Sequence, residues 1–431
     1  MKVLWITNRP IAAAERKFNV KAISGTWMEP TLLGLEKTDG IEISVATVAP
    51  VNAVEHFEED NITYYLVPQD SKRTYRYDDP AHIKQWKQVI DEAKPDIIMQ
   101  WGTEYAHGLC ALRIAKEKGI PSVTEMQGVM ESIEYYYLSN MTRSQIKKAY
   151  SLRNFIKHDG LYDEQKFFGK KAEIEKQMLN YSENIIIEND WATAHCRYIN
   201  PKAKLFVHHL NIDEIFFKKN WSLETCEKHS IFTCASAYPL KGLHVLLEAL
   251  AIVKRSVPDV KLYAPGFQDP FSKTDFKSKF RQQGYEKYLM YLITKLGIRD
   301  NVVFTGRLTQ QQMAERMEQS HVMVVPSAIE NHSSTLREAM AVGVPSIASY
   351  VGGIPETIEH GKNGFLFRHE EYIQLADFIL RLFNDDEKAK LFSQNGKNYI
   401  RPYLDINKST EQLVEIYKAV SYTHLRAHET R

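Results

Sequence analysis

Cysteine is scarce in this chain, and the few cysteines show no pattern. The 431 residues include only Cys110, Cys196, Cys226 and Cys234, without the paired spacing that binds zinc. These residues are typical of reduced thiols in a cytosolic protein, which argues against a disulfide scaffold. No apolar run approaches the ~20 residues that a membrane span needs. The first residues, MKVLWITNRP, turn polar too quickly for a signal peptide, so we expect a cytoplasmic protein.

An excess of charge of one sign is also missing. The formal net charge of +1 creates no general field that would attract nucleic acid, and we expect no nucleic-acid partner. No Gly-x-Gly-x-x-Gly motif follows the first predicted strand, which argues against a Rossmann oxidoreductase. Neither an Asp-x-Asp pair nor a histidine cluster suited to a metal is found, so we expect no metal and no cofactor.

Short apolar runs alternate with amphipathic segments along the whole chain. This alternation is typical of parallel βαβ units, and the length suffices for two α/β domains. The strands predicted in the first half are 3–7, 41–48, 62–67, 96–101, 122–126, 184–187 and 205–208. Those predicted in the second half are 230–234, 260–264, 302–305, 322–325 and 346–349.

The pattern restarts after Phe217, which divides the chain. It predicts an α/β fold of two Rossmann-like, doubly wound domains that face each other across a cleft, over residues 1–217 and 218–404. A polar bridge over 218–228 is the expected linker. A last helix over 405–420 is expected to return to the first domain, and 421–431 is interpreted as a non-native tail.

The segment 131–176 is rich in lysine, arginine and aromatic residues. The favoured interpretation is a solvated pair of helices over an aromatic core, because glutamate and aspartate are interleaved with the cations. The alternative is a surface that docks on anionic lipid, which would make the protein peripheral on the inner face of the membrane.

The stretch 324–367 carries the densest chemistry. It reads as a buried strand, a polar loop, a helix start, a Gly-Pro break, a strand and a double-glycine turn. Glu330 lies just past the first strand and is separated from Glu338 by seven residues, and carboxylates can hold sugar hydroxyls. Each acid also has an ordinary structural interpretation. Glu330 could be a solvated loop acid, and Glu338 could close a capping box with Thr335.

Amides and a lysine complement these acids. The polar run Asn331, Ser333, Ser334 and Thr335 would expose unpaired amides at a helix start, where an anion is favoured. Lys241 lies in a strand-to-helix turn beside a glycine, a place suited to meeting phosphate. Together the acids, amides and lysine predict a site for a nucleotide-sugar.

With these motifs the chain resembles the retaining glycosyltransferases of family 4, which have the two-domain GT-B fold. The resemblance spans nearly the whole chain and is strongest in the second half. Besides Glu330 and Glu338, the matching segments are 241–242, 338–341, 343–345, 352–356 and 360–365.

The resemblance implies roles for the matching positions. Lys241 would contact the donor diphosphate, Glu338 would hold the ribose hydroxyls, and Glu330 would lie near the transferred sugar. Amides around 333–335 would receive phosphate or sugar oxygens. Gly25 would line the cleft near the donor phosphate. The leaving phosphate would help to deprotonate the acceptor hydroxyl in an attack from the face of departure.

Two positions depart from the family pattern. Ser236 stands where an arginine is usual, so a second cation would have to come from elsewhere, and Arg307 is one candidate. Gln127 stands where a histidine is usual, and a glutamine can hydrogen-bond a sugar but cannot carry a proton. A subgroup of the family is similar to this chain in having Gln127-Gly128 together with the upstream Trp-Gly-Thr-Glu of 101–104.

We therefore expect a retaining, metal-independent glycosyltransferase with Lys241, Glu330 and Gln127 in catalytic positions. It would move a sugar from a nucleotide-diphosphate sugar to a glycan, glycolipid or small-molecule hydroxyl. By analogy alone, the setting is polysaccharide biosynthesis. The alternative is a catalytically weak nucleotide-sugar-binding or regulatory protein of the same fold, which Ser236 and Gln127 favour.

Overall fold

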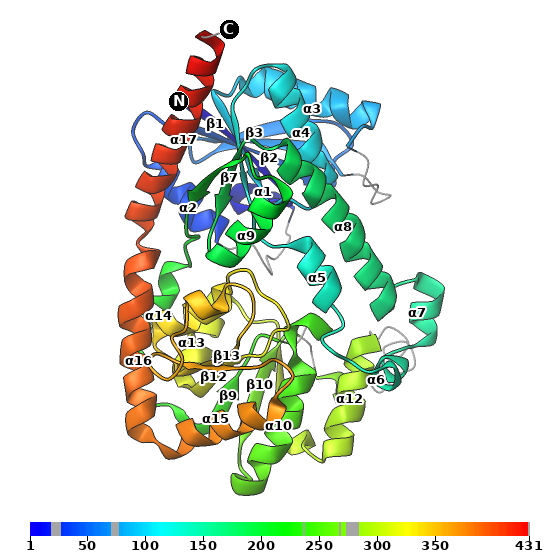
Figure 1. Cartoon of the computed structure of the whole chain (residues 1–431), viewed down its shortest axis with the longest axis vertical. Coiled ribbons are helices and arrows are strands. Elements are labelled where there is room, and N and C mark those ends of the chain that lie inside the picture. Colours follow the sequence, from blue (N-terminus) through cyan, green and yellow to red (C-terminus); the bar gives the residue numbers. More distant parts are fainter. Residues whose placement is uncertain (19–26, 70–76, 236–237, 267–268, 273–283, 430–431) are drawn as a thin grey trace. The chain divides into compact units, whose positions relative to one another are not determined.

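The computed structural model of the chain describes residues 1–18, 27–69, 77–235, 238–266, 269–272 and 284–429, with side chains up to residue 422 (Figure 1). These residues form two compact units. The first contains residues 1–130, 169–212 and 404–431, and the second contains 131–168 and 213–403.

The first unit is built on an eight-stranded sheet in the order β3-β4-β2-β1-β5-β6-β7-β8. All neighbouring strands are parallel except β3 and β4. The strands are β1 (Lys2–Thr7), β2 (Glu42–Ala49), β3 (Glu55–Glu59), β4 (Ile62–Pro68), β5 (Ile97–Trp101), β6 (Ser122–Glu125), β7 (Asn184–Ile187) and β8 (Lys204–Val207). Helices of this unit are α1 (Ala12–Lys17), α2 (Met28–Glu36), α3 (Pro80–Ala93), α4 (Ala106–Glu117), most of α8 (Leu161–Tyr181), α9 (Asp190–Ile199) and α17 (Ile406–Glu429).

The second unit has a parallel six-stranded sheet in the order β11-β10-β9-β12-β13-β14. Its strands are β9 (Glu227–Phe232), β10 (Lys261–Pro265), β11 (Val302–Gly306), β12 (Ser320–Val325), β13 (Ser346–Ser349) and β14 (Phe365–Phe367). Its helices are α5 (Met130–Tyr136), α6 (Arg143–Lys148), α7 (Leu152–Lys157), α10 (Leu243–Ser256), α12 (Gly284–Leu296), α13 (Gln310–Gln319), α14 (Ser334–Val342), α15 (Tyr372–Asn384) and α16 (Asp386–Ile400).

Every predicted strand is present, within a few residues of its predicted bounds. Two strands were not predicted. The residues of β3 are mostly exposed and charged, and β14 has only three residues, so neither has the apolar run that marks a strand in sequence.

The assignment of residues 131–168 to the first domain is wrong. In the structure this segment belongs to the second unit, because its buried Tyr137, Met141, Ile146 and Ala149 join that unit's hydrophobic core. A buried apolar face must pack somewhere, and the sequence pattern does not say against which sheet.

The predicted linker over 218–228 is also part of the second unit. Trp221 is buried, its backbone N–H donates to Val342 O (3.0 Å) and its indole N–H donates to Ser320 O (2.7 Å). The division between the units falls earlier, between Ile212 and Asp213.

The last helix, α17, belongs to the first unit and packs on α2. The buried indole N–H of Trp5, in the central strand β1, donates to Tyr417 Oη on this helix (3.0 Å). The helix runs on to Glu429, and the interpretation of 421–431 as non-native stays a prediction. Among the described residues, no helix combines the length and apolar character that crossing a bilayer requires.

Candidate functional site

The candidate donor site lies at the carboxyl edge of the second sheet. Its three central neighbouring strands, β9, β12 and β13, are parallel, so the loops that follow them meet at one edge. Lys241 follows β9, Glu330 follows β12, and Gly352 follows β13. In doubly wound sheets, ligands bind at this edge.

Lys241 and Glu330 form an ion pair at this edge. The ammonium nitrogen of Lys241 lies 2.6 Å from Glu330 Oε1, and the hydroxyl of Ser327 donates to the same oxygen (2.7 Å). Burial lowers the pKa of Lys241, but the charge and the hydrogen bond of Glu330, together with Tyr238 and Cys234, outweigh burial, so the pKa is raised. The lysine therefore stays a cation, as a phosphate contact requires.

Backbone contacts fix the turn that carries Lys241. The amide of Ala328 donates to Leu240 O (2.7 Å), which joins the turn after β9 to the loop after β12. Gly242 has a left-handed φ of 76°, and a Cβ atom there would lie 1.9 Å from Pro326 O. Only glycine fits this position, which explains the Lys-Gly sequence.

A second glycine fixes Glu330. Gly352 has a φ of +50°, and a Cβ atom there would lie 1.8 Å from Glu330 O. The next amide, that of Gly353, donates to the same carbonyl (3.2 Å). The double-glycine turn after β13 thus supports the backbone of Glu330 directly, as the predicted close approach requires.

Helix α14 begins beside this pair. Ser333 is its N-cap, and the Ser333 hydroxyl accepts from the amide of Leu336 (3.3 Å). The amides of Ser334 and Thr335, in the first turn, have no acceptor within the helix. Asn331, in the preceding loop, is buried together with Ser333. The helix start that the polar run predicted is therefore present, directly after the loop that carries Glu330.

The capping-box interpretation of Glu338 is wrong. Because Ser333 is the N-cap, Leu336 and not Glu338 occupies the position of the returning side chain. Glu338 lies in the second turn and is buried, and burial raises its pKa to about 7. No described residue makes a hydrogen bond to its carboxylate, so its buried polar group is available to a ligand.

Three other residues were predicted to bind the donor: Arg307, Ser236 and Gly25. Arg307 follows β11 at the edge of the sheet, is exposed, and lines a depression with Asp269 and Phe304. One strand, β10, separates β11 from β9, the strand that precedes Lys241. Ser236 and Gly25 lie outside the described residues.

Gln127 belongs to a separate polar cluster in the first unit. It follows β6, and its side-chain nitrogen is buried without a hydrogen-bond partner among the described residues. A Cβ atom on Gly102 would lie 2.5 Å from Asn8 Nδ2, 2.9 Å from Glu104 Oε2 and 3.5 Å from Gln127 Oε1. Asn8, Glu104 and Gln127 therefore gather around one glycine at the carboxyl ends of β1, β5 and β6.

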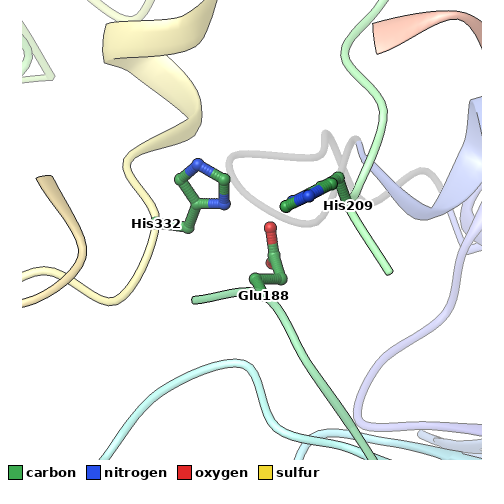
Figure 2. A group of neighbouring side chains, drawn as sticks. All are labelled: Glu188, His209 and His332. Atoms are coloured by element: carbon green, nitrogen blue, oxygen red, sulfur yellow. The ribbon is translucent and has the colours of Figure 1, made fainter. Parts of the chain in front are cut away.

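Sequence reasoning missed several of these polar residues. Asn8 carried a usable signal, because it directly follows the first strand. Glu188 and His209 follow β7 and β8, and a carboxylate oxygen of Glu188 lies within 4.8 Å of a ring nitrogen of His209 (Figure 2). Only strand order brings these two together, because 20 residues separate them in the sequence.

The fold of the two units is that of the GT-B class of proteins, α/β with parallel, Rossmann-like sheets. Sucrose-phosphate synthase from Thermosynechococcus elongatus superposes with a TM-score of 0.72 at 16% identity, over 98% of this chain and 99% of that one. The Anabaena protein HepE in complex with UDP-glucose gives a TM-score of 0.66 at 17% identity, over 97% and 100%. At these identities the likeness concerns the fold.

Within this class, residues 214–399 match the family described as Glycosyl transferases group 1. Among curated relatives, N-acetyl-alpha-D-glucosaminyl L-malate synthase of Bacillus anthracis is 33% identical over 138 residues, 32% of this chain and 35% of that protein. D-inositol 3-phosphate glycosyltransferase of Streptomyces avermitilis is 33% identical over 150 residues, 34% of this chain and 30% of that protein. The chain thus spans about a third of the length of these relatives.

Proposed function

We propose that this protein is a retaining glycosyltransferase that takes its sugar from a nucleotide-diphosphate sugar. The observation that carries the proposal is the Lys241–Glu330 pair beside the first turn of α14. It lies inside the segment that matches Glycosyl transferases group 1. The site offers a cation for phosphate, free helix amides for oxyanions and acids for hydroxyls.

In the proposed reaction, the donor diphosphate takes the place of Glu330 as the partner of Lys241. Lys241 and the amides of Ser334 and Thr335 stabilise the negative charge that grows on the leaving diphosphate. Glu338 holds the ribose hydroxyls, and Glu330, displaced from the lysine but still held by Ser327, faces the transferred sugar. Arg307 or Ser236 adds to donor binding.

The acceptor hydroxyl is proposed to attack from the face that the diphosphate leaves. The leaving phosphate takes the acceptor proton, so the scheme calls for no protein nucleophile and no metal. Gln127 is proposed to hydrogen-bond the sugar, and Gly25 is proposed to contact the donor phosphate. We propose a glycan, glycolipid or small-molecule acceptor and a cytoplasmic location.

HepE was crystallised with UDP and with UDP-glucose, which makes UDP-sugars the first donors to test. The purified chain is incubated with UDP-, GDP- and ADP-sugars, and free nucleotide is measured, because transferases commonly hydrolyse the donor slowly without acceptor. Release of nucleotide that Lys241→Ala abolishes supports the proposal. A thermal shift with one nucleotide-sugar, but no nucleotide release with any acceptor, would instead support the non-catalytic alternative that Gln127 favours.

A further inference from the structure

Helix α7 exposes large apolar side chains on one face. The exposed fractions are 67% for Leu152, 64% for Phe155 and 60% for Ile156. Their spacing of three and four residues places them side by side on the helix. Tyr150, just before the helix, is exposed as well. A contiguous apolar face of this kind commonly marks an interaction surface.

This face belongs to a firmly anchored element. On the other side of α7, the buried Asn154 amide donates to Asp159 O (3.1 Å) and to Asp159 Oδ1 (2.8 Å). The preceding helix α6 packs against α12, where a Cβ atom on Gly284 would lie 1.8 Å from Ala149 O (Figure 1). The inner side of the α6–α7 segment, residues 143–158, is therefore committed to the core of the second unit, and Leu152, Phe155 and Ile156 are left outside.

The same segment is strongly basic. Residues 143–158 contain five lysines and arginines and no aspartate or glutamate. Arg153 pairs with Asp159 (2.8 Å), whereas Lys147 and Lys157 are exposed and have no ion pair among the described residues. Lys147 and Lys157 therefore lie in the same segment as the apolar face, and no acid of that segment offsets their charge.

We propose that the outer face of the α6–α7 segment is a docking surface for an anionic lipid bilayer. Apolar tips that enter the boundary between headgroups and acyl chains, with lysines at headgroup level, are how interfacial helices bind membranes. An apolar partner alone would leave Lys147 and Lys157 without counter-charges, and a purely acidic partner would leave Leu152, Phe155 and Ile156 in water.

Hydrogen bonds through His369 connect the turn before this segment with the loop that follows β12. The ring of His369 donates through Nδ1 to Pro326 O (3.0 Å), and its other nitrogen lies 2.7 Å from the hydroxyl of Ser139, in the turn that leads into α6. Bilayer docking would thus hold the unit that carries Lys241 and Glu330 at the lipid surface.

The test is sedimentation of the full chain with vesicles of phosphatidylcholine, with or without phosphatidylglycerol. We expect binding to vesicles that contain phosphatidylglycerol and weaker binding as salt is added. Phe155→Ser/Ile156→Ser should weaken that binding by about tenfold or more. Lys147→Gln/Lys157→Gln should weaken it by about fivefold per charge.

The matched control is Ile373→Ser on α15, since Ile373 is also 60% exposed and lies outside the segment. We expect it to bind vesicles like the unchanged chain, and all three variants to melt alike because the altered side chains are exposed. Equal vesicle binding by all variants, or none by the unchanged chain, would overturn the proposal. A dimer that Phe155→Ser/Ile156→Ser dissociates, without any vesicle binding, would assign the face to a second copy. None of these readings depends on transferase activity.

Discussion

The Lys241 ammonium and the Glu330 carboxylate lie 2.6 Å apart, although 89 positions separate them in the sequence. The contact joins the turn after β9 to the loop after β12 and keeps the lysine charged. In the proposed reaction a diphosphate replaces the carboxylate as its partner. The predictions below test this relationship and its surroundings.

Lys241→Ala should lower turnover by about 30- to 1000-fold, because one preorganised charge contact is worth about 2–4 kcal/mol in the transition state. The measurement is kcat with saturating donor, alongside the melting temperature, which should change little. Lys254→Ala is the control, because Lys254 lies in the following helix α10 and donates to Gly297 O at the surface. If Lys241→Ala turned over at the rate of the unchanged chain, the proposed contact between Lys241 and the diphosphate would be wrong.

Glu338→Gln should alter how nucleotide binding depends on pH. Burial raises the pKa of Glu338 to about 7, so the carboxylate that accepts ribose hydroxyls best is formed as the pH rises through about 7. We expect the affinity for UDP or GDP to rise over that interval in the unchanged chain and less in Glu338→Gln. The measurement is calorimetric titration of both proteins across this pH interval. The ionisation of the nucleotide affects both proteins equally, so the difference between them reports on Glu338.

The raised pKa of Glu338 also predicts how the stability of the fold changes with pH. The folded chain holds this proton up to about pH 7, whereas an ordinary glutamate loses it near 4.5. Because the unfolded chain binds fewer protons in that window, the free energy of unfolding should fall as pH rises from 4.5 to 7, by at most about 3 kcal/mol. The difference in unfolding free energy between the unchanged chain and Glu338→Gln should follow this curve. A difference independent of pH would mean that Glu338 is ionised throughout.

Gly352→Ala should lower turnover by more than its loss of folding stability accounts for. Its methyl group would lie 1.8 Å from Glu330 O, so the loop that carries Glu330 must move. Gly361→Ala is a matched control, because Gly361 also has a left-handed φ, +79°, but open space around it. Both should lose about 1 kcal/mol from backbone strain, and Gly352→Ala should lose more because its methyl group also meets the backbone of Glu330. Only Gly352→Ala should also lose turnover by tenfold or more, since a small displacement of reacting groups is costly.

Gln127→Ala should lower turnover by roughly tenfold, the worth of one hydrogen bond to a substrate in a buried site. Since glutamine does not titrate, the shape of the pH–rate curve should be the same in both proteins. A changed curve would reveal that Gln127 acts through a titrating neighbour, for which Glu104 is the nearest carboxylate around Gly102.

The sequence alone determined the fold class, twelve of the fourteen strands among the described residues, and the glycines at positions 242 and 352. Each of these depends on local rules: an apolar run marks a buried strand, and a turn with positive φ selects glycine. It also placed Lys241, Glu330 and Gln127 at strand ends, because a strand's carboxyl end can be read along the chain.

Only the tertiary structure decided which of these ends meet. The order of strands brings Lys241 to Glu330 and gathers Asn8, Glu104 and Gln127 around Gly102, and that order is set by packing between distant segments. The position of the N-cap excluded the capping-box alternative for Glu338, and the fold buries this acid. Residues 131–168 pack on the core of the second unit, and the apolar face of α7 stays exposed. Burial and charge environment arise from contacts across the fold, so no local pattern encodes them.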